Sequence, residues 1–96
     1  MAIQRYAECI NEEAEKMAKY EASPTEIASA VVAECEYIFP FYRNAQIDYA
    51  NLHYQSHAAR MNFVKGIESV IADAREQGRG KALSKVISIR SQKSQQ

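Results

Sequence analysis

The sequence predicts an all-α protein, in which a helical hairpin packs against a long third helix. Only three Gly and two Pro occur in 96 residues, so few positions interrupt regular structure. Ala, Glu, Lys and Gln, which favour helices, are plentiful. Apolar residues also recur at spacings of three and four, the period of a helix with one buried face. We therefore expect a three-helix bundle-like fold that is oligomeric and ends in a disordered basic tail.

Residues 2–22 form the first expected helix. Its apolar residues lie three or four positions apart and make one stripe: Ile3, Ala7, Ile10, Ala14 and Met17. Tyr6 and Tyr20 widen this apolar sector to nearly half of the helix, which predicts contact with two neighbouring helices.

The second expected helix begins at a capping signal. Ser23 can accept a hydrogen bond from the amide of Glu26, and Pro24 stands where a missing amide hydrogen costs nothing. We expect the helix to stop or kink at Phe39, because Pro40 disfavours a helical residue before it. Its buried face would hold Ile27, Ala28, Val31, Val32, Cys35, Ile38 and Phe39. A linker of about two residues to the first helix predicts an antiparallel hairpin.

The third expected helix is long. Ten positions recur at helical spacing, and all but one are apolar: Phe41, Ala45, Tyr49, Leu52, Ser56, Ala59, Phe63, Ile67, Val70 and Ala74. Gly66 weakens the helix by about 1 kcal/mol, and Gly78 is the next stop signal. A helix of about 36 residues would be about 54 Å long and would overhang a second helix of about 24 Å. The alternative is a break near Ser56, the polar member, which would fold the overhang back into a four-helix monomer.

The composition changes after Gly78, and we assign residues 1–78 to a single helical domain and residues 79–96 to a flexible basic tail. Residues 75–96 hold six basic residues and one acidic residue, whereas residues 1–40 hold eight acidic and three basic ones. The formal net charge of zero therefore conceals two oppositely charged segments. We expect the tail either to bind nucleic acid or to pair with the acidic half of a neighbouring subunit.

Length and composition exclude several classes of protein. A chain of 96 residues is too short for a Rossmann or barrel scaffold, and 47% apolar with 25% charged residues is typical of folded chains. No segment is apolar enough for a signal-peptide core or a membrane span. Cys9 and Cys35 lie at similar heights in the hairpin, but Cys9 is about 120° from the first stripe, so we expect both thiols to be reduced. These points favour a soluble cytoplasmic protein without membrane contact.

The chain carries no pattern typical of a catalytic site. It has no glycine-rich phosphate loop, no nucleophile elbow and no carboxylate pair that burial would obviously perturb. His53 and His57 lie four positions apart, as metal ligands on a helix do, but no third ligand is evident. We therefore expect no catalytic residue, no metal and no other cofactor, with a metal-dependent enzyme at these histidines as a distant alternative.

Aromatic residues gather around the second bend and predict a protein-binding surface. Tyr and Arg are typical of interfaces because they bury a large area and keep polar contacts. The residues assigned to this surface are Tyr42, Arg43, Gln46, Tyr49, His53, Tyr54, His57 and Arg60. The function that follows is a small non-enzymatic binding module, an adaptor, regulator or inhibitor. The competing interpretation is that the rings only fill a corner of the bundle.

A second contact surface is expected between subunits. The far half of the third helix lacks intrachain cover, and burying each of its large side chains is worth about 1.5–3 kcal/mol. We assign this homo-oligomer interface, a dimer as first choice, to Phe63, Val64, Ile67, Val70, Ile71 and Ala74. The alternative function is a nucleic-acid-binding accessory protein. Its phosphate contacts would come from Arg79, Lys81, Lys85, Arg90 and Lys93.

Overall fold

The computed structural model describes the backbone of residues 2–94 and the side chains of residues 3–92. Within this range the chain forms four helices and no strand: α1 (Ala2–Met17), α2 (Pro24–Cys35), α3 (Ile38–His53) and α4 (His57–Ser94). The predicted all-α class is confirmed.

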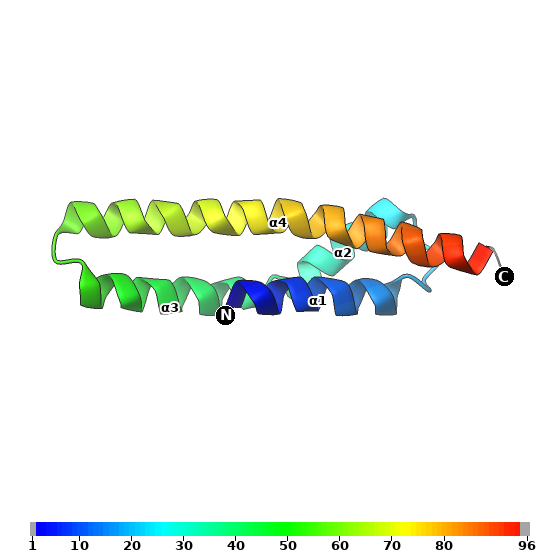
Figure 1. The fold of residues 1–96 in the computed structure, drawn as a ribbon, viewed down its shortest axis with the longest axis horizontal. Helices are drawn as coiled ribbons and strands as arrows, with labels where there is room; N and C mark the ends of the chain where they lie inside the picture. The colour runs from blue at the N-terminus through cyan, green and yellow to red at the C-terminus, as the bar shows by residue number, and fades with distance from the viewer. Residues whose placement is uncertain (1, 95–96) are drawn as a thin grey trace.

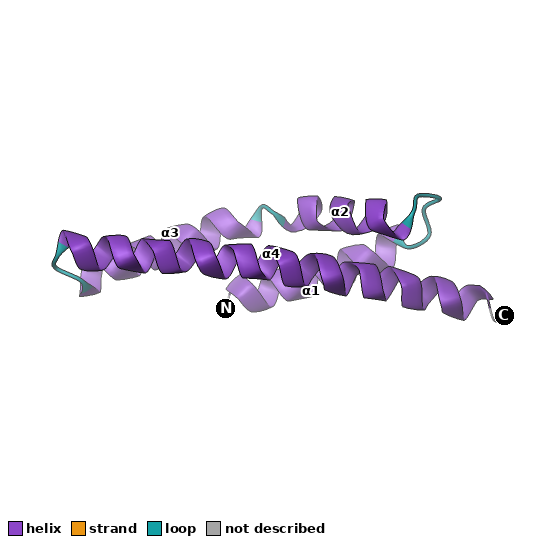
Figure 2. Ribbon diagram, turned by 90° about the horizontal axis from the view of Figure 1, so that it is seen from above, coloured by secondary structure: helices purple, strands orange, loops and turns teal. Residues whose placement is uncertain are grey.

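The molecule is a rod of 60 × 16 × 16 Å, and α4 runs along its whole length (Figure 1). The C-terminal half of α4 packs against α1 and α2, and this three-helix part is called the body. The N-terminal half of α4 packs against α3 as an antiparallel hairpin, whose residues 41–70 are called the arm. The arm projects from one end of the body in both views (Figure 2).

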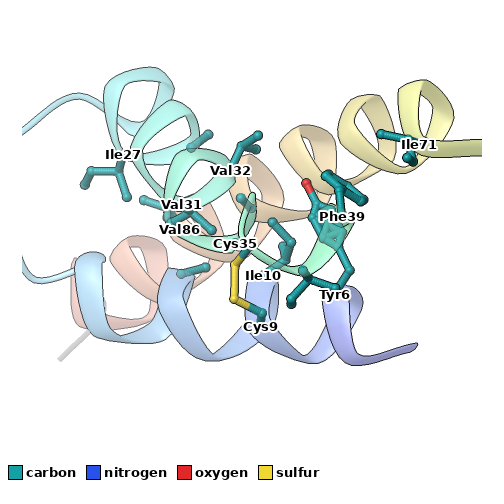
Figure 3. Close-up of a cluster of buried hydrophobic side chains, with 14 of the residues drawn as sticks. Tyr6, Cys9, Ile10, Ile27, Val31, Val32, Cys35, Phe39, Ile71 and Val86 are labelled. Atoms are coloured by element: carbon teal, nitrogen blue, oxygen red, sulfur yellow. A yellow bond between two sulfur atoms is a disulfide. The ribbon is translucent and has the colours of Figure 1, made fainter. Parts of the chain in front are cut away.

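The body encloses the hydrophobic core. Its most deeply buried large side chains are Phe39, Ile10, Ile71, Val31, Val86 and Cys35 (Figure 3). The ring of Tyr6 packs edge-on against Phe39 with 4.5 Å between the ring centroids. Arg75 covers the other side of this cluster, because its guanidinium lies 5.1 Å from the Phe39 ring centroid and its Nε donates to Glu36 Oε1 at 2.7 Å.

Helix α2 begins where the sequence predicts. The Ser23 hydroxyl accepts a hydrogen bond from the Glu26 amide at 3.2 Å, and Pro24 is the first helical residue. Every residue assigned to the buried face of this segment is buried. The expected end at Phe39 is wrong, because α2 ends at Cys35 and Pro40 is the third residue of α3. Pro40 fits there because the first helical turn has no intrahelical partner for an amide hydrogen.

The prediction of a continuous third helix is also wrong, and the alternative prediction, a break near Ser56, is confirmed. Tyr54 is extended, with φ −117° and ψ 118°, and the Ser56 hydroxyl accepts a hydrogen bond from the Ala59 amide at 3.0 Å. Ser56 thus caps α4 as an N-cap serine does. The chain reverses at this point, and the predicted overhang folds back along α3.

The basic tail is not a separate flexible segment over the residues that the structure describes. Residues 79–94 continue α4, and Ala82 and Val86 are fully buried against the body. Gly78, the predicted stop signal, lies inside the helix and does not end it. Residues 95 and 96 of the predicted tail lie outside the described part.

The basic C-terminal segment contacts the acidic N-terminal segment of the same chain. Lys85 Nζ lies 3.1 Å from Glu15 Oε1, and Arg90 donates to the backbone oxygens of Ala18, at 3.2 Å, and Tyr20. The basic end of α4 thus packs along the acidic helix α1 and caps the carbonyl end of that helix.

The two cysteines form a disulfide, so the expectation of two reduced thiols is wrong. Cys9 and Cys35 have a Cα–Cα distance of 5.9 Å. Helix α1 is rotated relative to its predicted stripe, because Tyr6 and Cys9 are buried while Ala7 is exposed. The wide apolar sector of α1 lets it face two helices at once, and Cys9 then points at α2. Since disulfides are typical of oxidising compartments, the low cysteine count no longer favours the cytoplasm.

Candidate protein-binding surface

The arm has only two helices, so much of its apolar surface stays exposed. The stripe Phe41, Ala45, Tyr49 and Leu52, expected to be buried, faces solvent instead. Phe41 is 71% exposed and Leu52 is 81% exposed. The reason is that α3 turns another side, which includes Ala50, toward α4. The helical spacing of these apolar residues was therefore predicted correctly, but the helix expected to cover them does not cover them.

A shallow groove runs between the two helices of the arm. It is lined by Tyr42 and Gln46 from α3 and by Asn62, Phe63, Gly66, Ile67 and Val70 from α4. The lining is largely apolar and contains no charged side chain. Gly66 leaves this groove open, because a Cβ at this position would meet no atom within 4 Å.

Aromatic rings brace the far end of the arm. The ring of Tyr49 stacks on Phe63 with 5.9 Å between centroids and lies 4.3 Å from the ring of His53. Tyr54 joins this cluster at 5.3 Å from Phe63. The cluster connects α3 to α4 across the turn and holds Tyr49 in place, although Tyr49 is half exposed.

Two arginines assigned to partner binding make contacts inside the chain. Arg60 donates to the backbone oxygens of Tyr54 and Gln55, at 2.9 and 3.0 Å, and so ties down the turn between α3 and α4. Arg43 donates to both carboxylate oxygens of Glu68, at 2.6 and 3.1 Å. These hydrogen bonds from Arg43 lower the pKa of Glu68 and raise the pKa of Arg43. Arg60 therefore holds the turn in place, and Arg43 joins the two helices that carry the predicted binding surface.

The two sides of the arm differ in charge. Arg43 and Glu68 join α3 and α4 along one side, whereas Tyr42, about 100° from Arg43 on α3, lies on the groove side. The groove side, together with the exposed stripe of α3, is called the uncharged face. Its members are Phe41, Tyr42, Ala45, Gln46, Tyr49, Leu52, Asn62, Phe63, Gly66 and Val70.

His53 and His57 are both exposed at the tip of the arm. Among the described residues no group of three His, Cys, Asp or Glu side chains lies close enough together to hold a metal ion. His53 instead packs beside the ring of Tyr49.

The predicted oligomer interface is divided by the fold. Ile67 and Ile71 are buried within the chain, at 3% and 0% exposure, because α3 and the body cover them. The expectation that they lack intrachain cover is therefore wrong. Phe63, Val64 and Ala74 are half-buried, and Val70 remains exposed on the uncharged face.

The described residues among those predicted to bind phosphate differ in their contacts. Lys85 and Arg90 make the contacts with α1 described above, while Arg79 and Lys81 are exposed on α4. The side chain of Lys93 lies outside the described part of the chain.

Sequence reasoning missed five members of the uncharged face: Phe41, Ala45, Leu52, Asn62 and Gly66. The signal that could have found Gly66 is its place inside a helix, where glycine costs about 1 kcal/mol relative to alanine. Phe41 and Leu52 carried no separate signal, because an apolar stripe looks the same whether a helix of the same chain or another molecule covers it.

Comparison with known proteins adds no relative. No protein-family model matches the chain, and neither a curated protein nor a solved structure matches it. Among the described residues, none of the helices has both the length and the apolar composition that a membrane span requires.

Proposed function

We propose that this protein is a non-enzymatic helical binding module that docks another polypeptide chain through the uncharged face of its arm. The observation that carries the proposal is the concentration of exposed apolar side chains there. Of the eight large apolar residues exposed in the described part of the chain, four lie on this face, and a fifth, Met61, lies elsewhere in the arm. The four are Phe41, Tyr49, Leu52 and Val70. Exposed apolar side chains concentrated in one region are typical of interaction sites.

The composition of the face supports a protein partner. It combines aromatic rings, aliphatic side chains and neutral polar groups, and charged residues are absent from it. The centres of protein interfaces have this composition, because aromatic side chains bury a large area while losing few rotamers, and charges are costly to desolvate. An adaptor, regulator or inhibitor requires no more than such a surface on a stable support.

The body provides that support. Among the described core residues only Ile67 belongs to the arm, although Tyr42 and Phe63 of the uncharged face pack against the core, and the Cys9–Cys35 disulfide joins α1 to α2 in the body. Phe41 and Leu52 therefore contribute little to folding, and their exposure has no evident structural purpose. Burying two such side chains against a partner would contribute about 1.5–3 kcal/mol each.

A photo-crosslinking experiment tests the proposal. The crosslinking amino acid benzoylphenylalanine is placed at Leu52, in the centre of the surface, or at Ala30, an exposed position on α2 in the body. In cells of the native host we expect a defined protein adduct from position 52 and no matching adduct from position 30. The adduct from position 52 should disappear when Phe41→Asp is also present. Equal adduct patterns from the two positions would contradict the proposal.

A further inference from the structure

We infer that the chain docked on the uncharged face is a second copy of this protein, bound antiparallel so that the two arms form a four-helix bundle. This inference rests on the proposed function, since it names the occupant of the same surface.

The architecture of the rod creates the need for additional helices. In the body, α4 is covered by two helices, whereas in the arm it is covered by α3 alone. A two-helix hairpin can bury only the seam between its helices, so its apolar faces stay exposed to solvent. Two such hairpins stacked face to face make a four-helix bundle, one of the common stable helical folds. A second copy supplies a hairpin of matching length and polarity.

The side chains of α3 are self-complementary when one copy is reversed. Along the exposed stripe the order is Phe41, Ala45, Tyr49, Leu52. In an antiparallel pair Phe41 of one copy lies opposite Leu52 of the other, and the large Tyr49 ring lies beside the small Ala45. Alternation of large and small side chains across a seam is the arrangement that packs without voids. Reversal also sends the two bodies to opposite ends, so they do not collide.

Gly66 supports a close approach at the same face. Gly78, on the same helix, has an internal reason to be glycine, because a Cβ there would lie 2.9 Å from the hydroxyl oxygen of Tyr6. Gly66 and Gly80 have no such reason, because a Cβ at either position would meet nothing within 4 Å, but of the two only Gly66 lines the groove of the uncharged face. A helix-interior glycine allows another backbone to come near. In the antiparallel pair Gly66 lies near the two-fold axis, where α4 passes α4 of the second copy.

The charge distribution permits self-pairing. A two-fold axis brings each central residue near its own copy, so a charge in the centre of the face would be repelled by itself. The face holds none among residues 41–70. The nearest exposed carboxylates are Asp48, which lies about 20° beyond Phe41 on α3, and Asp73, which follows the arm seven residues after Gly66 on the same side of α4.

The available area sets the expected strength of the dimer. Two helices of about 16 residues lying about 10 Å apart present a face of roughly 24 × 20 Å, or about 480 Å² per copy. About 1,000 Å² in total is at the lower limit for a specific interface. We therefore expect a reversible dimer with a Kd in the micromolar range.

Sedimentation velocity of the full, oxidised chain between about 1 and 200 µM tests the inference. The parent should change from monomer to dimer over this range. Leu52→Asp should weaken the dimer at least about 100-fold while the melting temperature of the dilute monomer stays the same, because Leu52 is 81% exposed. Ala30→Asp, the matched control on the body, should leave the Kd unchanged.

A second variant separates loss of the interface from loss of the fold. Gly66→Leu improves helix propensity, and its Cβ would meet nothing within 4 Å, so it should fold at least as stably as the parent and yet remain monomeric. Antiparallel pairing is checked by photo-crosslinking the purified dimer from position 52. The adduct should map to residues near Phe41 of the second copy.

The outcomes distinguish the two proposals. A parent that remains monomeric to about 200 µM overturns the dimer, as does a dimer that neither Leu52→Asp nor Gly66→Leu weakens. If the parent is monomeric and position 52 crosslinks a different protein in cells, the proposed function survives without a second copy. If position 52 forms no adduct with any chain, both proposals fail.

Discussion

Gly78 and Tyr6 form a contact on which the packing of α1 against α4 depends, and replacing Gly78 by alanine tests it. A Cβ at position 78 would lie 2.9 Å from Tyr6 Oη and 3.3 Å from both Tyr6 Cζ and Ile10 Cδ1. The Tyr6 ring cannot easily move away, because it is 2% exposed and packs against Phe39. The added methyl group must therefore displace a buried ring.

The change in the free energy of unfolding caused by Gly78→Ala is the sum of two opposing contributions. Alanine in place of glycine inside a helix stabilises by about 1 kcal/mol, whereas overpacking a buried contact costs about 1–3 kcal/mol. We expect Gly78→Ala to lower the free energy of unfolding by about 1 kcal/mol and the melting temperature by about 4–8 °C. Gly80→Ala is the matched control, because Gly80 is exposed and a Cβ there meets nothing within 4 Å. It should stabilise by about 1 kcal/mol.

A double-mutant cycle identifies the clashing atom. The Tyr6 hydroxyl is buried and has no hydrogen-bond partner among the described residues, so Tyr6→Phe removes the atom closest to the new methyl group without breaking a bond. In the Tyr6→Phe background we expect Gly78→Ala to be neutral or stabilising, a coupling of about 1–2 kcal/mol. Urea and thermal unfolding followed by circular dichroism measure all four proteins. Gly78→Ala effects that are equal in the two backgrounds would refute the contact.

Three further predictions concern the body. Thiol titration of the unfolded, unreduced protein should find no free thiol, and reduction should destabilise the fold by about 3–4 kcal/mol, since the Cys9–Cys35 bond closes a loop with a sequence separation of 26; two titratable thiols would contradict the pairing. Removing residues 79–96 should abolish cooperative thermal unfolding, because Ala82 and Val86 are fully buried; an unchanged melt would restore the flexible tail. Burial raises the pKa of Tyr6 above its ordinary value of 10.0, so the unfolded state ionises first and stability should fall as the pH rises past about 10. Tyr6→Phe should flatten this fall, and identical pH profiles for the two proteins would refute it.

Local signals in the sequence were sufficient to predict the helical class and some helix boundaries. The Ser23 cap and Pro24 determine the start of α2, because they act on amide groups within one turn of the chain. The buried face of the segment from Ile27 to Phe39 was also predictable, since its apolar residues are dense and leave one possible face. In both cases the physical cause lies within a few residues.

The end of α4 shows where local signals fail. Gly78 resembles a helix stop because glycine lowers helix propensity by about 1 kcal/mol. In the fold the same residue is required by the Tyr6 ring, which comes from α1 and lies far away in sequence. Burial of Ala82 and Val86 against the body then outweighs the local penalty, and the helix continues to Ser94.

The candidate surface was also predictable from the sequence only in part. The sequence by itself determined that residues 41–74 carry a helical apolar period and that aromatic residues gather near the second bend. Only the tertiary structure decided that the chain reverses at Ser56, that Ile67 is covered by its own chain, and that Phe41 and Leu52 are not. The physical reason is that amphipathicity specifies which side of a helix avoids water, while the position of every other helix decides what covers that side.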